Sequence, residues 1–207
     1  MAEKLGRWGI DKTCQVVVYD DSYGVMASRL WWILRWLGHE AVAVMDGGFP
    51  KWQREGRPVT PEWPAIPAAA FHPTINDASW VDAGYVLQMM EQKNGVLMDA
   101  RAEERFRGEV EPFDKVAGHV PGAINMPYED NLDFSGELMS DEALREHYRA
   151  VMNDVAPDKV VHMCGSGVTA CHNILAMEHA GLAGSRLYAG SWSEWITDAD
   201  RPVTKGE

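Results

Sequence analysis

The sequence predicts an α/β fold, in which a mostly parallel central sheet is flanked by helices. Short apolar runs of strand length alternate along the 207 residues with segments of helical periodicity. This alternation is typical of parallel strands that are joined by helices. The second half of the chain also repeats the pattern of the first half, so the fold is expected to contain one unit preceded by a partial second copy.

The expected strands are short apolar runs, and the expected helices carry apolar residues three and four positions apart. The strands are expected at 15–19, 41–45, 96–99, 123–126, 160–163 and 186–188. The helices are expected at 25–37, 82–92, 140–153 and 168–180. Ser140 is expected to cap its helix, because a hydroxyl at this position accepts a hydrogen bond from a free amide of the first turn.

An internal repeat appears when the chain is shifted by 143 residues. The matched pairs include Val17 and Val160, Gly24 and Gly167, Gly38 and Gly181, Gly47 and Gly190, and Trp52 and Trp195. A single offset that holds across strand, loop, helix and strand indicates two copies of one unit. In this alignment Asp21 stands where the second copy has Cys164, so the first copy is expected to lack the chemistry of the second.

The composition excludes several classes of protein. A formal net charge of −12 argues against a general binder of nucleic acid or of membrane surfaces. No apolar run approaches the ~18 residues of a membrane helix. The three cysteines, Cys14, Cys164 and Cys171, form no disulfide framework, which favours a cytoplasmic location. No zinc-ligand spacing is present, and neither a metal nor another cofactor is expected.

The segment 164–170, with the sequence Cys-Gly-Ser-Gly-Val-Thr-Ala, carries the most chemical information. It places the thiol of Cys164 between an expected buried strand and an expected helix, at the sheet edge where open α/β sheets bind ligands. The glycines allow successive amide groups to point inward, and the helix adds its positive end. This environment favours a thiolate nucleophile. The same spacing also fits a buried structural cysteine.

The segment resembles the active-site loop of two-domain sulfurtransferases of the rhodanese superfamily, and in particular that of the 3-mercaptopyruvate sulfurtransferases. Further similar features follow in order along the chain. They are Asp-Ala-Arg at 99–101, Arg-Phe at 105–106, Gly-His-Val-Pro-Gly-Ala at 118–123, and Tyr-Ala-Gly-Ser-Trp-Ser-Glu-Trp at 188–195. The resemblance covers nearly the whole chain, and it implies a rhodanese-like catalytic domain preceded by part of an inert one.

The resemblance implies roles for individual residues. Cys164 would take sulfane sulfur from 3-mercaptopyruvate or thiosulfate, become a persulfide, and pass the sulfur to a thiol or cyanide. Arg105 would bind the small anionic donor, because a guanidinium matches a carboxylate or thiosulfonate; without the resemblance it would pass for an ordinary charged loop residue. The loop would complete the substrate site through Gly165, Ser166, Gly167, Val168 and Thr169.

The chain also departs from the family pattern. The family's second arginine would fall at Asp114. The next residue, Lys115, is a candidate substitute, although it offers a point charge instead of a planar fork. Asp99 is a candidate brace for the active-site loop. His119 is expected to fix a turn. A cysteine phosphatase is disfavoured, since its loop needs an arginine six residues after the cysteine and Ala170 stands there.

These observations predict a domain division. Residues 1–62 would be the back half of an inert rhodanese-like domain, 63–76 a proline-rich linker, and 77–207 the catalytic domain. The counterpart of the front half would fall before Met1, so the chain is expected to be truncated, with an apolar face left open on its first part. The alternative function is a non-catalytic or impaired sulfur-carrier or regulatory module.

Overall fold

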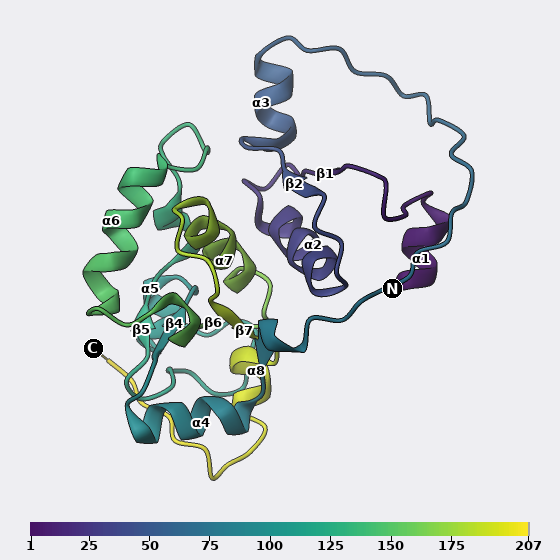
Figure 1. Ribbon diagram of the computed structural model, residues 1–207. Coiled ribbons are helices and arrows are strands. Elements are labelled where there is room, and N and C mark those ends of the chain that lie inside the picture. Colours follow the sequence, from purple (N-terminus) through teal and green to yellow (C-terminus); the bar gives the residue numbers. More distant parts are fainter. Residues whose placement is uncertain (207) are drawn as a thin grey trace. The chain divides into compact units, whose positions relative to one another are not determined.

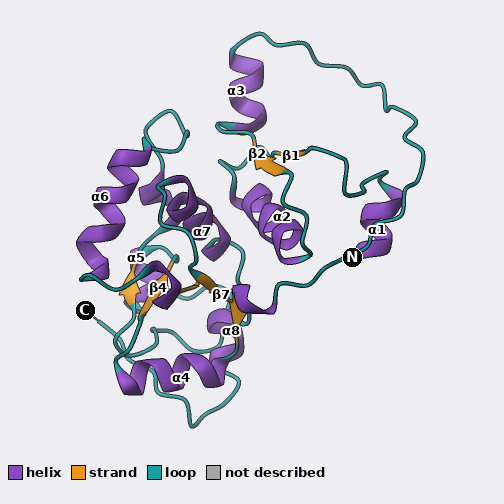
Figure 2. Cartoon of the chain, in the orientation of Figure 1, coloured by secondary structure: helices purple, strands orange, loops and turns teal. Residues whose placement is uncertain are grey.

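The computed structural model describes residues 1–206, and Glu207, the last residue of the predicted catalytic domain, lies outside the described residues. The chain forms two compact units, Met1–Asp77 and Ala78–Glu207, which are treated separately below (Figures 1 and 2). Between residues 1 and 206, no helix has both the length and the apolar character needed to cross a membrane.

The second unit is built on a five-stranded sheet with the strand order β3-β7-β6-β4-β5. Every neighbouring pair is parallel, which confirms the predicted fold class. The strands are β3 Trp80–Val81, β4 Val96–Asp99, β5 Ile124–Asn125, β6 Val160–Met163 and β7 Arg186–Tyr188. The short edge strand β3 was not predicted, because a two-residue pairing leaves no periodicity to detect.

Helices cover both faces of this sheet (Figure 1). On one face lie α4 Ala83–Gln92 and α8 Ser191–Trp195, and on the other lie α6 Asp141–Met152 and α7 Ala170–His179. The remaining helical segments are α5 Glu103–Phe106 and the 3-10 turns η1 Asp77–Ser79, η2 Tyr128–Asn131 and η3 Pro157–Lys159. Ser140 caps α6 as predicted, with its Oγ accepting from the Ala143 N–H over 3.3 Å.

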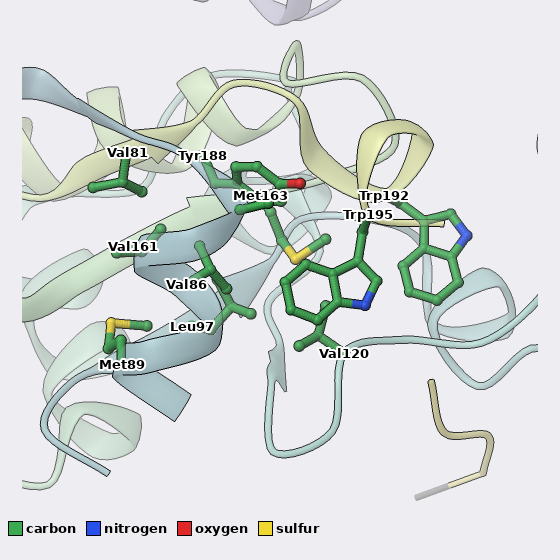
Figure 3. Packing of buried hydrophobic residues seen from close by; sticks show 11 residues of the cluster. Val81, Val86, Met89, Leu97, Val120, Val161, Met163, Tyr188, Trp192 and Trp195 are labelled. Carbon is green, nitrogen blue, oxygen red and sulfur yellow. The ribbon is translucent and has the colours of Figure 1, made fainter. Parts of the chain in front are cut away.

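The strand residues divide between two hydrophobic cores, because successive side chains of a strand point to opposite faces. Leu97 and Met163 belong to the core that contains α4 and α8 (Figure 3). Met98 and Val160 belong to the core that contains α6 and α7. All four side chains are fully buried. Burial on both faces fixes the central strands, and with them the loop that follows β6.

The first unit contains α1 Ala2–Arg7, β1 Val16–Val18, α2 Val25–Trp36, β2 Val42–Val44 and α3 Gly48–Arg54. Strands β1 and β2 form a parallel pair. The series β1, α2, β2, α3 repeats the series β6, α7, β7, α8 of the second unit in order and in type. Even a detail recurs, since Trp52 Nε1 donates to the Pro58 carbonyl over 2.9 Å and Trp195 Nε1 donates to that of Pro202 over 2.9 Å.

The proline-rich segment 63–76 contains no helix or strand, but its backbone is hydrogen-bonded to the first unit. Its backbone donates hydrogen bonds within the first unit, from Ala69 to Gly6 over 2.9 Å and from Thr74 to Leu37 over 2.9 Å. One face of the β1–β2 pair is open, since Val17 is 54% and Tyr19 is 58% exposed. The Trp-rich helix, which was expected to expose an apolar patch, is instead covered, since Trp31 and Trp32 are 5% and 6% exposed.

Candidate active site

Cys164 follows β6 directly, so its thiol lies at the carboxyl edge of the sheet, between the ends of β4 and β7. The loop 164–169 then leads into α7. Cys164 is 2% exposed. This is the strand-end position that the sequence predicted for a nucleophile, and it is where open α/β sheets bind ligands.

The segment after β7 holds the loop in place. The Cys164 N–H donates to Ser191 Oγ over 3.1 Å, and the Ser191 hydroxyl donates in turn to the Tyr188 carbonyl over 2.9 Å. The amide of Trp192 donates to the Cys164 carbonyl over 3.0 Å, and that of Ser193 donates to the Gly165 carbonyl over 2.9 Å. The two strand-end segments therefore form one hydrogen-bonded platform beneath the thiol.

Gly167 sets the direction of the loop. Its N–H donates to Cys164 Sγ over 3.1 Å. Its φ of +75° is one that side chains rarely adopt, and a Cβ at this position would lie 2.5 Å from the Ala189 carbonyl oxygen. Only glycine satisfies both conditions without strain. The amide that contacts the thiol thus depends on the absence of a side chain.

Arg105, in the short helix α5, lies over the loop. A Cβ built on Gly165 would be 3.4 Å from Arg105 Nη2 and 3.5 Å from Nη1. The guanidinium is also held from its other side, because Nη2 donates to both carboxylate oxygens of Glu111, over 2.8 and 3.1 Å. The Phe113 ring lies against it, 4.9 Å from the guanidinium carbon to the ring centroid. The cation is thus fixed beside the cysteine loop.

A cavity of about 270 Å³ contains the thiol and the guanidinium together. The residues that line it are Arg105, Phe113, Asp114, Cys164, Gly165, Ser166, Val168, Thr169 and Ser193. Six of these nine were expected from the sequence, and the expected Gly167 does not line the cavity but donates its amide to Cys164 Sγ. Phe113 and Ser193 were not predicted as site residues, since an aromatic ring and a serine near a turn carry no distinctive signal.

Two hydroxyl side chains of the loop belong to the cavity lining. Ser166 and Thr169 line the cavity, whereas the hydrogen bond that Cys164 Sγ accepts within residues 1–206 comes from the Gly167 amide. The hydroxyls are therefore placed to meet a molecule in the cavity rather than the thiol itself.

Comparison with known proteins agrees with this geometry. The family profile for the Rhodanese-like domain matches residues 1–55 and 82–198. The chain belongs to the rhodanese family. It is 44% identical over 208 residues to the probable 3-mercaptopyruvate sulfurtransferase of Pseudomonas aeruginosa, and this match covers 100% of the chain and 73% of that relative. It is 38% identical over 200 residues to the thiosulfate sulfurtransferase of Bos taurus, covering 94% of the chain and 67% of that enzyme.

Solved structures show the same fold. The anaerobic ergothioneine biosynthesis enzyme from Chlorobium limicola, in complex with trimethyl histidine, superposes with a TM-score of 0.84 at 22% identity. The match covers 98% of this chain and 54% of that enzyme, so this rhodanese-family chain spans about half the length of the solved structure. At this level of identity the likeness supports the fold alone.

The first unit corrects one detail of the repeat alignment. The aligned sequences placed Asp21 opposite Cys164, whereas the hydrogen bonds place Asp20 there. The Phe49 amide donates to the Asp20 carbonyl over 2.8 Å, as the Trp192 amide donates to the Cys164 carbonyl over 3.0 Å. The first loop is one residue longer, and a fixed offset cannot detect an insertion inside a turn.

The Asp20 carboxylate is surrounded by backbone amides of the loop and helix start that follow it, residues 22–27. It accepts four amide hydrogen bonds, two on each oxygen and all between 2.8 and 2.9 Å, from Ser22, Gly24, Met26 and Ala27. Burial would raise the pKa of Asp20, but these hydrogen bonds outweigh it and hold the pKa below its usual value. The rhodanese-type loop of this chain is thus built to surround an anion with amide groups.

Asp99 does not brace the cysteine loop. Its carboxylate is fully buried and accepts hydrogen bonds from Arg101, with Nη2 at 2.7 Å and Nε at 3.0 and 3.1 Å from its oxygens. Arg101 also donates to the Gly118 carbonyl over 2.8 Å. The pair therefore ties the end of β4 to the turn before β5, because a buried carboxylate needs a charged partner close by.

Two further residues were named from the sequence, Lys115 and His119. Lys115 is exposed and does not line the cavity, so it does not stand in for the family's second arginine there. His119 fixes a turn as predicted, since its Nδ1 lies 2.7 Å from the Phe106 carbonyl oxygen and its ring stacks on Phe106 with 3.8 Å between centroids.

Proposed function

We propose that this chain is a sulfurtransferase that works through a persulfide on Cys164. The observation that carries the proposal is the shared cavity, in which the Cys164 thiol and the Arg105 guanidinium face the same space at the carboxyl edge of the sheet. The names of its rhodanese-family relatives support 3-mercaptopyruvate or thiosulfate as the donor.

The chemistry takes two steps. The Cys164 thiolate attacks the thiol sulfur of 3-mercaptopyruvate or the outer sulfur of thiosulfate. A new sulfur–sulfur bond forms, and the donor's own carbon–sulfur or sulfur–sulfur bond to that atom breaks. Pyruvate enolate, which then takes up a proton, leaves from 3-mercaptopyruvate, and sulfite leaves from thiosulfate. An acceptor thiolate or cyanide then attacks the outer sulfur and releases the Cys164 thiolate. This is covalent, ping-pong catalysis.

The first unit indicates how the loop would hold the persulfide. There the two oxygens of Asp20 each accept two amide hydrogen bonds, so a loop of this type has room for two acceptor atoms. In the second unit Cys164 Sγ accepts from the Gly167 amide. We propose that the remaining amides at the start of α7 donate hydrogen bonds to the outer sulfur. Charge on that sulfur is stabilised by such preorganised donors.

The domain roles follow from the same comparison. We propose that residues 77–207 are the catalytic domain and that residues 1–62 are an inert, partial rhodanese-like copy joined through 63–76. The amides that would serve a sulfur atom in the first unit are already satisfied by Asp20. We place the protein in the cytoplasm, since its three free cysteines suit a reducing compartment.

The test is direct loading with sulfur. The purified chain is incubated with each donor, and its intact mass is measured before and after addition of a thiol or cyanide. We expect the mass to rise by one sulfur atom and to return on addition of the acceptor. Cys164→Ser should not load, whereas the control Cys14→Ser should load like the parent chain. Loading of Cys164→Ser would overturn the proposal.

A turnover assay with the same donors and acceptors separates the enzyme from the alternative, a sulfur-carrier or regulatory module. A sulfur-carrier or regulatory module would accept one sulfur and release it slowly, without repeated turnover. A sulfurtransferase should form product in large excess over protein. Single loading without turnover would therefore favour the carrier function over the enzyme.

A further inference from the structure

The cavity beside Cys164 is lined by one acidic side chain as well as by one basic side chain. Among the described lining residues, the side chains of formal charge are Arg105 and Asp114. Their nearest atoms, Arg105 Nη2 and Asp114 Oδ2, are 3.8 Å apart, and the side chains are 17% and 13% exposed. A donor that reaches Arg105 therefore comes close to a carboxylate.

The charge of Arg105 is already balanced by a different residue. Glu111 is 2% exposed and contacts Arg105 Nη2 over 2.8 Å. Burial would raise the pKa of Glu111, but hydrogen bonds from Arg105 and from the Phe113 and Asp114 amides outweigh it and lower the pKa. Glu111 therefore stays ionised at neutral pH and pairs with Arg105, while its Oε2 also lies 3.4 Å from Arg101 Nη1.

The charge of the neighbouring Arg101 guanidinium is also balanced by a carboxylate. Arg101 pairs with Asp99 through a 2.7 Å contact, and both side chains are buried. The Arg101 and Arg105 guanidiniums thus have the Asp99 and Glu111 carboxylates as partners, which leaves the Asp114 carboxylate as the surplus negative charge of this cluster.

We propose that Asp114 sets the donor selectivity of this site by disfavouring donors with two negative charges. The inference rests on the sulfurtransferase function proposed above. A donor with one carboxylate, such as 3-mercaptopyruvate, brings a single charge to Arg105. Thiosulfate brings two, and the second lies in a partly enclosed space beside Asp114, where like charges repel more strongly than in water. The site therefore favours singly charged mercapto-acid donors.

The test is the ratio of kcat/KM for the two donors in Asp114→Asn, which keeps the size of the side chain and removes its charge. We expect kcat/KM for thiosulfate to rise about tenfold and that for 3-mercaptopyruvate to change much less, because the repulsion acts on the second charge. The matched control is Glu109→Gln, which removes one negative charge from the same segment at an exposed position outside the cavity. This control should leave the ratio unchanged.

The dependence of turnover on ionic strength is a second measurement. It would not change if Asp114 had only a structural role. Salt should raise thiosulfate turnover by the parent chain relative to 3-mercaptopyruvate turnover, and this effect should shrink in Asp114→Asn. If the kcat/KM ratio of the two donors is unchanged in Asp114→Asn, or if kcat/KM falls equally for both, the inference is overturned. The proposed function still stands in that case, provided that Cys164 loads with sulfur. Failure of the parent chain to load from either donor would overturn the proposed function itself.

Discussion

The amide of Gly167 donates a hydrogen bond to the Sγ of Cys164 over 3.1 Å. A thiolate accepts such a bond more strongly than a thiol does, because the acceptor is charged. The contact therefore places a hydrogen-bond donor at the atom where negative charge develops during sulfur transfer. It also links reactivity to a backbone conformation that glycine alone adopts easily, since Gly167 has a φ of +75°.

Gly167→Ala should disturb both stability and reactivity. The added Cβ would lie 2.5 Å from the Ala189 carbonyl oxygen, and strain plus collision should lower the free energy of unfolding by about 2–3 kcal/mol. Alkylation of Cys164 should also become slower as the amide is displaced. Denaturant titration and iodoacetamide kinetics would measure the two effects.

The matched control is Gly181→Ala. Gly181 has the same φ of +75°, but the nearest atom to its added Cβ is Arg145 Nη2 at 3.8 Å. This variant should show the conformational cost of about 1 kcal/mol alone and normal alkylation of Cys164. Equal effects of the two substitutions would mean that the collision at Ala189 has no consequence.

Arg105→Lys should weaken donor use and leave the cysteine reactive. Lysine keeps the positive charge but cannot reproduce the two contacts to Glu111 and a third toward the cavity. We expect kcat/KM to fall about 10- to 100-fold for both donors, an amount typical of a lost charged hydrogen bond. Alkylation of Cys164 by a small neutral reagent should be unchanged.

Arg107→Lys is the control for this prediction. Arg107 is 39% exposed and pairs with Glu103 on the surface. Its substitution should change kcat/KM little, because exposed ion pairs contribute little. A parent-like kcat/KM in Arg105→Lys would remove Arg105 from the donor site.

Much of the fold and of the site could be predicted because each feature has a local signal. Strands β4 and β6 were expected with the observed bounds, since runs buried on both faces are continuously apolar. The loop at Cys164 could be placed because glycines and the strand-to-helix transition mark it. The arginine at 105 was identified only through resemblance, because a charged loop residue looks the same whether or not it faces a cavity.

The features that escaped prediction depend on the directions in which side chains point at strand ends and in loops. Asp99 was expected to brace the loop, but Arg101 competes for it from two residues away and satisfies it fully. Lys115 was expected beside the donor, whereas the chain direction after Glu111 turns Asp114 toward the cavity instead. Neither outcome follows from spacing, because spacing does not give side-chain direction in a loop.

Asp99→Asn should destabilise the second unit strongly. The Arg101 and Asp99 side chains are 1% and 0% exposed, so removing the carboxylate charge leaves a buried guanidinium short of its partner. We expect a loss of about 3–5 kcal/mol in the free energy of unfolding. For comparison, Glu103→Gln breaks a surface pair and should cost less than about 1 kcal/mol. Comparable losses in the two variants would show that the buried pair is not important for stability.

His162, in β6, should make the stability of the second unit depend on pH. The side chain is fully buried, its Nε2 lies 3.1 Å from Met177 Sδ, and its Nδ1 has no hydrogen-bond partner among the described residues. Burial lowers the pKa of His162 from 6.5 to about 3, because the charged ring would lose its hydration. The folded chain therefore keeps this ring neutral.

The direction of the effect follows from proton binding. Below pH 6.5 the unfolded chain protonates His162, while the folded chain does so only near pH 3. Protonation thus favours the unfolded state across this window, and the stability present above pH 6.5 is lost as the pH falls toward 3. The expected slope is about 1.4 kcal/mol per pH unit, or roughly 2 kcal/mol between pH 6.5 and pH 5.

Denaturant titrations between pH 7 and pH 5, followed by tryptophan fluorescence, would measure this slope. Trp192 and Trp195 are buried in the core of the same unit, so they report its unfolding. His162→Phe, which fills the space with an apolar ring, should reduce the slope by the contribution of one proton. His179→Gln, at an exposed position in the last turn of α7, should keep the parent slope. A parent-like slope in His162→Phe would show that another group binds the proton on unfolding.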